Sequence, residues 1–398
     1  MDTHDASDLK PGGRRKTHRL QSRPPFECVA LLLQGGGSLG AYQAGVYEAL
    51  AEANLHPDWV AGISIGAINA AIIAGNSPEA RVDRLRTFWE EVTSNPLAGF
   101  DPLLARLLAR GDTAREAVNQ SSAMAALATG APGLFTPRMP FAWLNPPGTI
   151  EATSYYDTAP LRVTLERLVD FDRINADAIR LSVGAVNVQS GNFAYFDSKT
   201  HMLRVEHVMA SGALPPGFPA IEIEGDWYWD GGLVSNTPLQ WLVEQEPRQD
   251  TLAFQVDLWS ARGDLPRTLT EVATRQKEIQ YSSRTRANTD RVRNSQRMRN
   301  MVADLLAKLP PELRDTEEVK KLGAANRRKV FNIVHLIYRA QNYEGQSKDY
   351  EFSRLSMQEH WRAGYNDTVR TLRHPEVLER PDNREGVSTF DLTIGGEE

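Results

Sequence analysis

Residues 60–69 read Val60-Ala61-Gly62-Ile63-Ser64-Ile65-Gly66-Ala67-Ile68-Asn69, an apolar strand end followed by a tight turn and the start of a helix. The turn has the pattern G-x-S-x-G, in which Ser64 would lie on a sharp strand-to-helix elbow with its hydroxyl at the sheet edge. Gly62 and Gly66 flank the serine because so tight a turn leaves little room for side chains. The N-terminus of the following helix favours an anion formed at Ser64. The pattern predicts a nucleophilic serine, and an ordinary glycine-rich turn is the alternative interpretation.

A second glycine-rich turn precedes this elbow. The apolar run from Glu27 to Gln34 predicts a central parallel strand that is buried on both faces. It leads into Gly35-Gly36-Gly37-Ser38-Leu39-Gly40 and then into a helix that begins at Ala41. Backbone N–H groups of such a loop converge with the helix N-terminus and can bind an anion. Because the elbow follows the next strand, we expect both turns at the same edge of the sheet.

The remaining chain supplies further strands and helices around this pair of turns. Apolar patterns and turn residues predict hairpins at 179–197 and 222–230, strands at 252–258 and 330–338, and helices at 77–93, 160–169, 207–213, 267–309 and 353–373. This order predicts a three-layer α/β/α sandwich with a mainly parallel central sheet. The composition changes near residue 262. We therefore expect a disordered basic tail at 1–25, an α/β domain at 26–261 and a helical C-terminal extension packed on it at 262–398.

Composition excludes several classes of protein. The chain has 398 residues, of which 41% are hydrophobic, and a net charge of −6, so a normal core is possible and no positive field suited to nucleic acid is present. The single cysteine, Cys28, cannot form an internal disulfide and is expected in the core. No Cys/His cluster has zinc spacing. The polar stretch at 1–25 is interpreted as the tail of a cytoplasmic protein, since it has the features of neither a signal peptide nor a membrane anchor.

A third feature, Asp230-Gly231-Gly232, ends one of the predicted hairpins. A nucleophilic serine needs a base for its proton and donors for the oxyanion that it creates. Asp230 could take the proton of Ser64 directly, since two glycines after it allow close approach of the backbone. The N–H groups of Gly36 and Gly37 are the candidate donors of an oxyanion hole. An Asp-Gly-Gly sequence is also common in ordinary turns between secondary-structure elements.

Together the three motifs resemble those of the patatin-like phospholipases. That family has G-G-G-x-x-G, G-x-S-x-G and D-G-[GA] in this order, and here they begin at Gly35, Gly62 and Asp230. The resemblance covers about residues 26–256, including Gly40, Gly66, Gly231 and Gly232 and the stretch 209–219. Leu39 stands where many members have Arg or Lys. Residues 348–354 are similar to an extension found on a bacterial branch of the family.

The resemblance implies a serine hydrolase of lipid carboxylic esters that uses a Ser64–Asp230 catalytic dyad. Ser64 would attack the acyl carbonyl, and Asp230 would take the proton and deliver it to the leaving alcohol. The N–H groups of Gly36 and Gly37 would bind the oxyanion, and water would hydrolyse the acyl-enzyme. The resemblance implies no metal ion and no organic cofactor.

Three other interpretations stay open at this point. The glycine pattern at 35–40 also fits a Rossmann-type dinucleotide site, although the next strand ends in Gly62-Ile63-Ser64 instead of an acidic residue. An α/β-hydrolase triad would need a histidine after the acid, for which the sequence offers His335, His360 and His374. A protein of the same fold could also bind lipid or a partner without catalysis.

A lipid substrate that is met at a membrane surface requires a docking region, and two stretches are candidates. Residues 95–150 are either packed irregular core or a lid or acyl-binding wall. Within them, the part from Phe100 to Leu144 combines apolar side chains with prolines, including Phe141 and Trp143, and is the first candidate. The arginine-rich helix from Arg275 to Arg299 could attract anionic lipid, but its polar residues run all round, which is typical of a solvated helix. We therefore favour the apolar stretch for docking.

Overall fold

The computed structural model describes residues 13–95, 111–245, 248–282, 285–341 and 343–392. Most of its strands form one sheet, in which hydrogen-bonded neighbours follow one another as β11-β10-β9-β1-β2-β5-β8-β7 and β6 also pairs with β5. The strands are β1 (Cys28–Leu33), β2 (Trp59–Ile63), β5 (Arg180–Asn187), β6 (Phe193–Asp197), β7 (Ile221–Ile223), β8 (Asp226–Asp230), β9 (Thr251–Asp257), β10 (Phe331–Ile337) and β11 (Val387–Asp391). A separate two-stranded sheet pairs β3 (Thr136–Pro137) with β4 (Tyr156–Asp157).

Helices cover both faces of the sheet, as the three-layer prediction requires. They are α1 (Ala41–Glu52), α2 (Ile65–Ala74), α3 (Arg81–Val92), α5 (Asp112–Thr129), α6 (Ala159–Leu168), α7 (Phe171–Asn175), α8 (Val205–Ser211), α9 (Leu239–Glu244), α10 (Leu269–Tyr281), α11 (Thr285–Ala307), α12 (Pro311–Arg314), α13 (Glu317–Ala325) and α14 (Arg354–Leu372). None of these helices is long and apolar enough to cross a membrane.

Strand β1 shows why the core lies on both sides of the sheet. Its alternate side chains Leu31 and Leu33 join the core beneath α1, α2 and α3. Ala30 and Leu32 point the other way, into a second core that includes side chains of α9 and α11. The prediction of a strand buried on both faces is therefore confirmed, and Cys28 is buried in the second core as expected.

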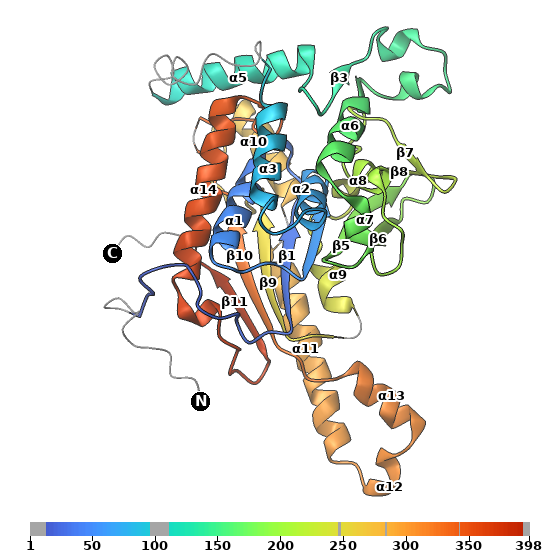
Figure 1. Cartoon of the computed structure of the whole chain (residues 1–398), viewed down its shortest axis with the longest axis vertical. Coiled ribbons are helices and arrows are strands. Elements are labelled where there is room, and N and C mark those ends of the chain that lie inside the picture. Colours follow the sequence, from blue (N-terminus) through green and yellow to red (C-terminus); the bar gives the residue numbers. More distant parts are fainter. Residues whose placement is uncertain (1–12, 96–110, 246–247, 283–284, 342, 393–398) are drawn as a thin grey trace.

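The C-terminal segment is largely helical, as predicted, with a strand at the predicted place near 330–338, but unlike a purely helical extension it also completes the sheet. Strand β10 pairs in parallel with β9, and β11 pairs in parallel with β10. Helix α14 packs along α1, while α12 and α13 project from the end of α11 away from the sheet (Figure 1). Residues 262–398 thus supply two strands and a covering helix to the same core as residues 26–261.

Two other stretches differ from the sequence predictions. Residues 13–25 contact the folded body, since the Arg15 amide donates to the Arg373 carbonyl and Arg23 pairs with Asp58, whereas 1–12 lie outside the described residues. Part of the 95–150 stretch is the 18-residue helix α5, which the sequence analysis did not predict. Residues 96–110 lie outside the described part of the chain.

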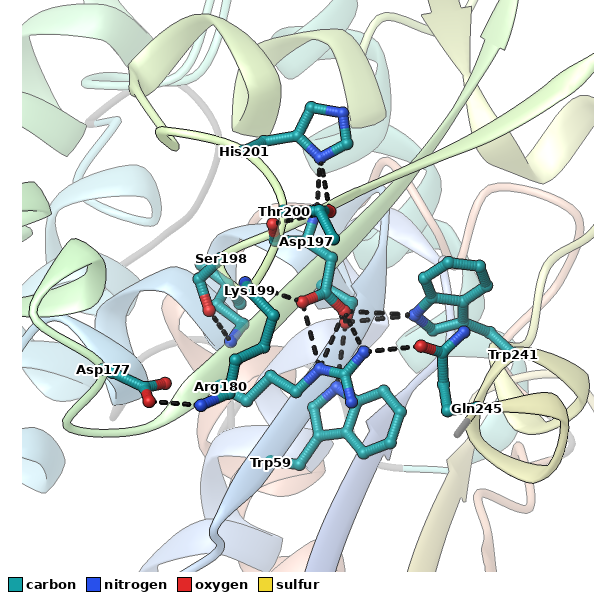
Figure 2. A network of polar contacts seen from close by, with 12 residues as sticks. Trp59, Asp177, Arg180, Asp197, Ser198, Lys199, Thr200, His201, Trp241 and Gln245 are labelled. Atoms are coloured by element: carbon teal, nitrogen blue, oxygen red, sulfur yellow. Dashed lines mark hydrogen bonds and ion pairs between the residues drawn. The ribbon is translucent and has the colours of Figure 1, made fainter. Parts of the chain in front are cut away.

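A buried polar network ties the first residues of β5 to β6 (Figure 2). Arg180 Nε donates to both carboxylate oxygens of Asp197 at 3.0 and 2.9 Å, and its guanidinium lies 3.8 Å from the ring centre of Trp59. The Ser182 hydroxyl donates to the same carboxylate at 2.6 Å. This network anchors the β5–β6 hairpin near the N-terminal ends of β5 and β2. Ser64 follows the C-terminal end of β2, on the opposite side of the sheet along the strand direction.

Candidate active site

Ser64 lies on the elbow between β2 and α2, in a backbone conformation that side chains rarely adopt, with φ 57° and ψ −126°. Its amide donates to the hydroxyl of Ser211 at 3.0 Å, and that hydroxyl donates to the Gly184 carbonyl at 2.7 Å. The flanking glycines leave no space for side chains. A Cβ on Gly62 would lie 2.2 Å from the Gly66 carbonyl oxygen, and one on Gly66 would lie 2.3 Å from the Leu33 oxygen.

Strand β8 brings Asp230 to this elbow from the opposite direction. Strand β2 runs parallel to β5 and ends with Ile63 opposite Gly184, whereas β8 runs antiparallel and ends with Asp230 opposite Ala185. Strand β6 occupies the other edge of β5 along these residues. Strands β2 and β8 therefore share one edge of β5, and their C-terminal ends meet. Ser64 and Asp230 come together at this junction.

The carboxyl group of Asp230 is 2% exposed and accepts a hydrogen bond from the Gly232 amide at 2.7 Å. Burial raises the pKa of Asp230 to about 7, against the opposing effect of hydrogen bonds from the Ser64 side chain and the Gly232 backbone. A carboxyl group with such a pKa is well suited to exchange protons near neutral pH. The same junction therefore holds a hydroxyl group and a buried carboxyl group side by side.

The glycine loop lies beside the elbow and is held by side chains from distant parts of the chain. Asn236 accepts from the Gly35 amide at 3.2 Å and donates to the Gly35 carbonyl at 3.1 Å. The Trp259 indole donates to the same carbonyl at 2.9 Å. The Ser38 amide donates to the Asp349 carbonyl at 2.8 Å. Within the described part of the chain, this leaves the amides of Gly36 and Gly37 as the loop donors without a protein acceptor.

Ser64 and Asp230 open into a cavity of about 410 Å³ whose walls are mainly apolar. The apolar wall comes from α5, α6 and the loops beside them, and it includes Leu127, Leu134, Phe135, Leu161, Phe218 and Phe352. Lys277, Tyr281, Asp349 and Trp259 supply a more polar end beside the glycine loop. The arrangement can accommodate an apolar acyl group at a nucleophile and present polar groups to the rest of an ester.

The three histidines that a triad could use lie outside the cavity lining, each in a different environment. Burial in β10 lowers the pKa of His335 to about 4. For His360, burial opposes the charged form, but the Glu344 carboxylate 3.5 Å away raises the pKa. His374 pairs with the exposed carboxylate of Glu376. No histidine is among the described residues that line the cavity.

The structure also bears on the cofactor alternatives. Asp58, the acidic residue beside β2, accepts from the Val29 amide at 2.7 Å, at the opposite end of β2 from the glycine loop. It is therefore not in the position that holds a ribose in dinucleotide-binding sites. Among the described residues, no three His, Cys, Asp or Glu side chains gather in a way that could hold a metal ion.

Sequence reasoning missed several residues of the site. Ser211 lies within the 209–219 stretch and Asn236 lies six residues after Asp230, but neither belongs to a recognised motif. An asparagine side chain can both donate and accept hydrogen bonds. This property is the only feature of the sequence that could have indicated Asn236 as a partner of the backbone of the glycine loop. No local signal indicates that Asp349, more than 300 residues from the glycine loop, reaches it.

Comparisons with known proteins show to which family of proteins the chain is similar. A family model described as patatin-like phospholipase matches residues 31–243, and one described as patatin phospholipase matches residues 279–384. The chain is 47% identical over 57 residues to lysophospholipase nte1 of Aspergillus terreus, and 39% identical over 71 residues to triacylglycerol lipase SDP1L of Arabidopsis thaliana. These matches cover 14% and 18% of this chain but only 4% and 8% of the relatives' own length.

Solved structures give more distant similarities. VipD from Legionella pneumophila aligns with a TM-score of 0.40 and 16% identity, covering 88% of this chain and 67% of VipD. ExoU in its complex with SpcU from Pseudomonas aeruginosa aligns with a TM-score of 0.30 and 20% identity, covering 68% of this chain and 52% of that one.

Proposed function

The chain belongs to the patatin-like phospholipase family, and we propose that it hydrolyses the carboxylic esters of lipids with Ser64 as nucleophile and Asp230 as base. The observation that carries this proposal is that the C-terminal ends of β2 and β8 meet, which brings Ser64 beside the buried carboxyl group of Asp230 at the wall of one cavity. A buried base in contact with a strained serine is the arrangement that nucleophilic ester hydrolysis needs. The apolar cavity beside it supports a lipid as substrate.

In the proposed reaction, the Ser64 hydroxyl attacks the acyl carbonyl while Asp230 accepts its proton. The amides of Gly36 and Gly37 donate to the oxyanion of the tetrahedral intermediate, whose collapse breaks the ester bond. Asp230 gives the proton to the leaving alcohol, and Ser64 remains acylated. Asp230 then takes a proton from water, whose oxygen attacks the acyl carbonyl. Collapse of this second tetrahedral intermediate breaks the bond to Ser64 and releases the fatty acid, while Asp230 returns the proton to the Ser64 oxygen.

Labelling by a fluorophosphonate probe tests this proposal. Wild type should be labelled, and Ser64→Ala should lose both labelling and hydrolysis. Asp230→Asn should lower hydrolysis by about three orders of magnitude or more, because Asn cannot accept the proton. Ser121→Ala, on the exposed face of α5, provides a control that should react like wild type.

Two results would contradict the proposal. Near-wild-type turnover by Asp230→Asn would remove the dyad, and loss of labelling on substituting His335, His360 or His374 in a folded protein would favour a triad. A wild-type chain that binds lipid vesicles but neither reacts with the probe nor hydrolyses esters of any acyl length would instead be a non-catalytic lipid-binding protein.

For access to lipid, we propose that the apolar loop after β3 docks on the surface of a membrane or lipid aggregate. Phe141 is 46% exposed and Trp143 is 69% exposed, and their rings stack with centres 4.9 Å apart. Met139 and Leu144 are exposed beside them. Such clustered apolar side chains are typical of interaction sites. Leu134 and Phe135, shortly before this loop, line the cavity, so docking would lie close to the entry of substrate.

The arginine-rich stretch is less suited to docking, because several of its charges contact the fold. It forms two helices, α10 and α11, and Arg275 pairs with Glu278 at 3.0 Å. Arg293 donates to Thr389 and Arg297 pairs with Glu385. The side chains of Arg284 and Arg286 lie outside the described part of the structure. The contacts of Arg293 and Arg297 show that α11 packs against β11 and the loop before it.

A further inference from the structure

Residues 348–349 of the C-terminal segment lie directly against the glycine loop. The Asp349 carbonyl accepts from the Ser38 amide at 2.8 Å, and the Lys348 carbonyl accepts from the Ser38 hydroxyl at 2.6 Å. Gly37 has φ +57°, and a Cβ on it would lie 2.0 Å from the Asp349 oxygen. The backbone of residues 348–349 therefore forms one wall of the loop that carries the Gly36 and Gly37 amides.

Helix α10 holds this wall in place through two crossed ion pairs. Lys348 Nζ donates to Glu278 Oε1 at 2.6 Å, and Lys277 Nζ donates to Asp349 Oδ1 at 2.5 Å. The Lys348 side chain is only 4% exposed, and its ammonium lies 5.3 Å from the ring centre of Trp259. Trp259 in turn binds the Gly35 carbonyl, so the contacts close into a circuit around the glycine loop.

We propose that Lys277, Glu278, Lys348 and Asp349 form a C-terminal clamp that positions the glycine loop for oxyanion binding. The inference rests on the proposed function and extends it to the C-terminal region, in which Lys348 and Asp349 lie within the second match to a family model. These are positioning residues, because they act through the backbone of Ser38. Amide donors stabilise an oxyanion only when they are held at the correct place before the reaction.

The clamp contacts the glycine loop next to residue 39, through the backbone and hydroxyl of Ser38. Leu39 is apolar and fully buried, and it is not among the described residues that line the cavity. The Asp349 carbonyl accepts a hydrogen bond from the Ser38 amide. Through this bond the clamp fixes the orientation of the loop that presents Gly36 and Gly37. Their geometry then depends on residues more than 300 positions later in the sequence.

Lys348 and Ser38 are the most informative positions for a test, because neither lines the cavity, whereas Lys277 and Asp349 do. Lys348→Met keeps an aliphatic stem against Trp259 and removes the ion pair. Glu278 keeps an ion-pair partner in this variant, since Arg275 remains 3.0 Å from its other carboxylate oxygen. For a soluble short-chain ester, Lys348→Met should lower kcat about tenfold to a hundredfold with KM within about twofold.

The rate of fluorophosphonate labelling should fall by the same factor, and Lys348→Arg should restore most of both. Ser38→Ala should also lower kcat, and the double variant Ser38→Ala/Lys348→Met should lose less than the product of the single losses, because both act through one contact. Hydrogen exchange at the Ser38 amide should become faster in Lys348→Met. This readout reports the clamp independently of any activity.

A matched control separates positioning from general stability. Lys329 forms an equally close pair with Glu27, at 2.6 Å, beside the start of β1, far from the glycine loop. Lys329→Met should lower the free energy of unfolding without changing kcat. The clamp is overturned if folded Lys348→Met keeps the wild-type kcat and Ser38 exchange rate, if only KM changes, or if Lys329→Met loses as much kcat. Absence of Ser64-dependent hydrolysis in wild type would instead overturn the proposed function.

Discussion

Ser64 has the backbone conformation of a strained residue, and its neighbours show how the strain is maintained. The Ser211 hydroxyl accepts from the Ser64 amide while donating to Gly184, so one side chain links the elbow to β5. Unfavourable dihedral angles at a non-glycine residue persist only where the surrounding structure enforces them. The motif G-x-S-x-G indicates such an elbow, but Ser211 is found only in the folded chain.

The raised pKa of Asp230 predicts how activity and stability depend on pH. As the proposed base it must be ionised, so kcat/KM should rise with pH through a midpoint near 7. The unfolded carboxyl titrates near 3.9. The folded state therefore holds a proton that the unfolded state has lost, and the stability due to this proton disappears as the pH rises through about 7.

Asp230→Asn has no such group to ionise, and it should exceed wild type in free energy of unfolding at pH 8. The difference should shrink as the pH falls to about 4, with an upper limit of about 4 kcal/mol, since each pKa unit corresponds to about 1.4 kcal/mol. Urea titrations of both proteins from pH 4 to pH 8 measure it. A constant difference across that range would show that the folded Asp230 does not titrate near neutrality.

At the scale of elements, the β5–β6 hairpin depends on the buried carboxylate of Asp197 (Figure 2). Asp197→Ala leaves Arg180 and Ser182 without their acceptor and should lower the free energy of unfolding by about 3–5 kcal/mol. Chemical denaturation measures this. Asp177→Ala removes an exposed pair with Lys199 near the same hairpin and should cost less than about 1 kcal/mol. Equal losses would mean that the buried network contributes nothing beyond a surface pair.

The loop after β3 makes a prediction about the physical state of the substrate. Replacing Phe141 and Trp143 by serine should lower activity on vesicles far more than activity on a soluble short-chain ester. Both rings are exposed, so their loss removes apolar surface for docking without opening a core cavity. Steady-state rates on both substrates decide the matter. Equal losses on the two substrates would show that these residues support the fold, and the docking proposal should then be abandoned.

At the scale of the whole molecule, the C-terminal segment is joined to the first helix by a close glycine contact. A Cβ on Gly364 in α14 would lie 2.0 Å from the Tyr42 carbonyl oxygen of α1, and one on Gly45 would lie 1.9 Å from that of Trp361. The two helices can approach this closely only because both positions lack a side chain. Together with β10 and β11, this contact makes residues 262–398 part of one core with the residues before them.

Gly364→Ala should therefore force α1 and α14 apart and lower the free energy of unfolding by about 1–3 kcal/mol. Thermal and chemical denaturation measure the change. Gly323 in α13 provides the control, because its Cβ would meet only Leu306, at 3.9 Å. Gly323→Ala should leave stability unchanged or increase it by up to about 1 kcal/mol through helix propensity. Similar effects at both sites would contradict the proposed tight packing.

The sequence by itself determined the local units of this protein. The strand, glycine turn and helix at residues 28–52, the elbow at 59–74 and the two hairpins follow from apolar period and turn residues that act over a few positions. It also indicated Ser64, Asp230 and the glycine loop as one site through the resemblance of three motifs. These features could be predicted from the sequence because each depends on residues that are close together in the chain.

Only the tertiary structure decided how those units meet. It placed β8 on the same edge of β5 as β2, so that Asp230 reaches Ser64 end to end. It also brought Asp349 to Ser38 and closed the sheet with β10 and β11. Such contacts join residues far apart in sequence, and their free energy comes from packing and burial of the whole chain. No local pattern of residues encodes that pairing, because the same strand could pair on either edge until the rest of the core is assembled.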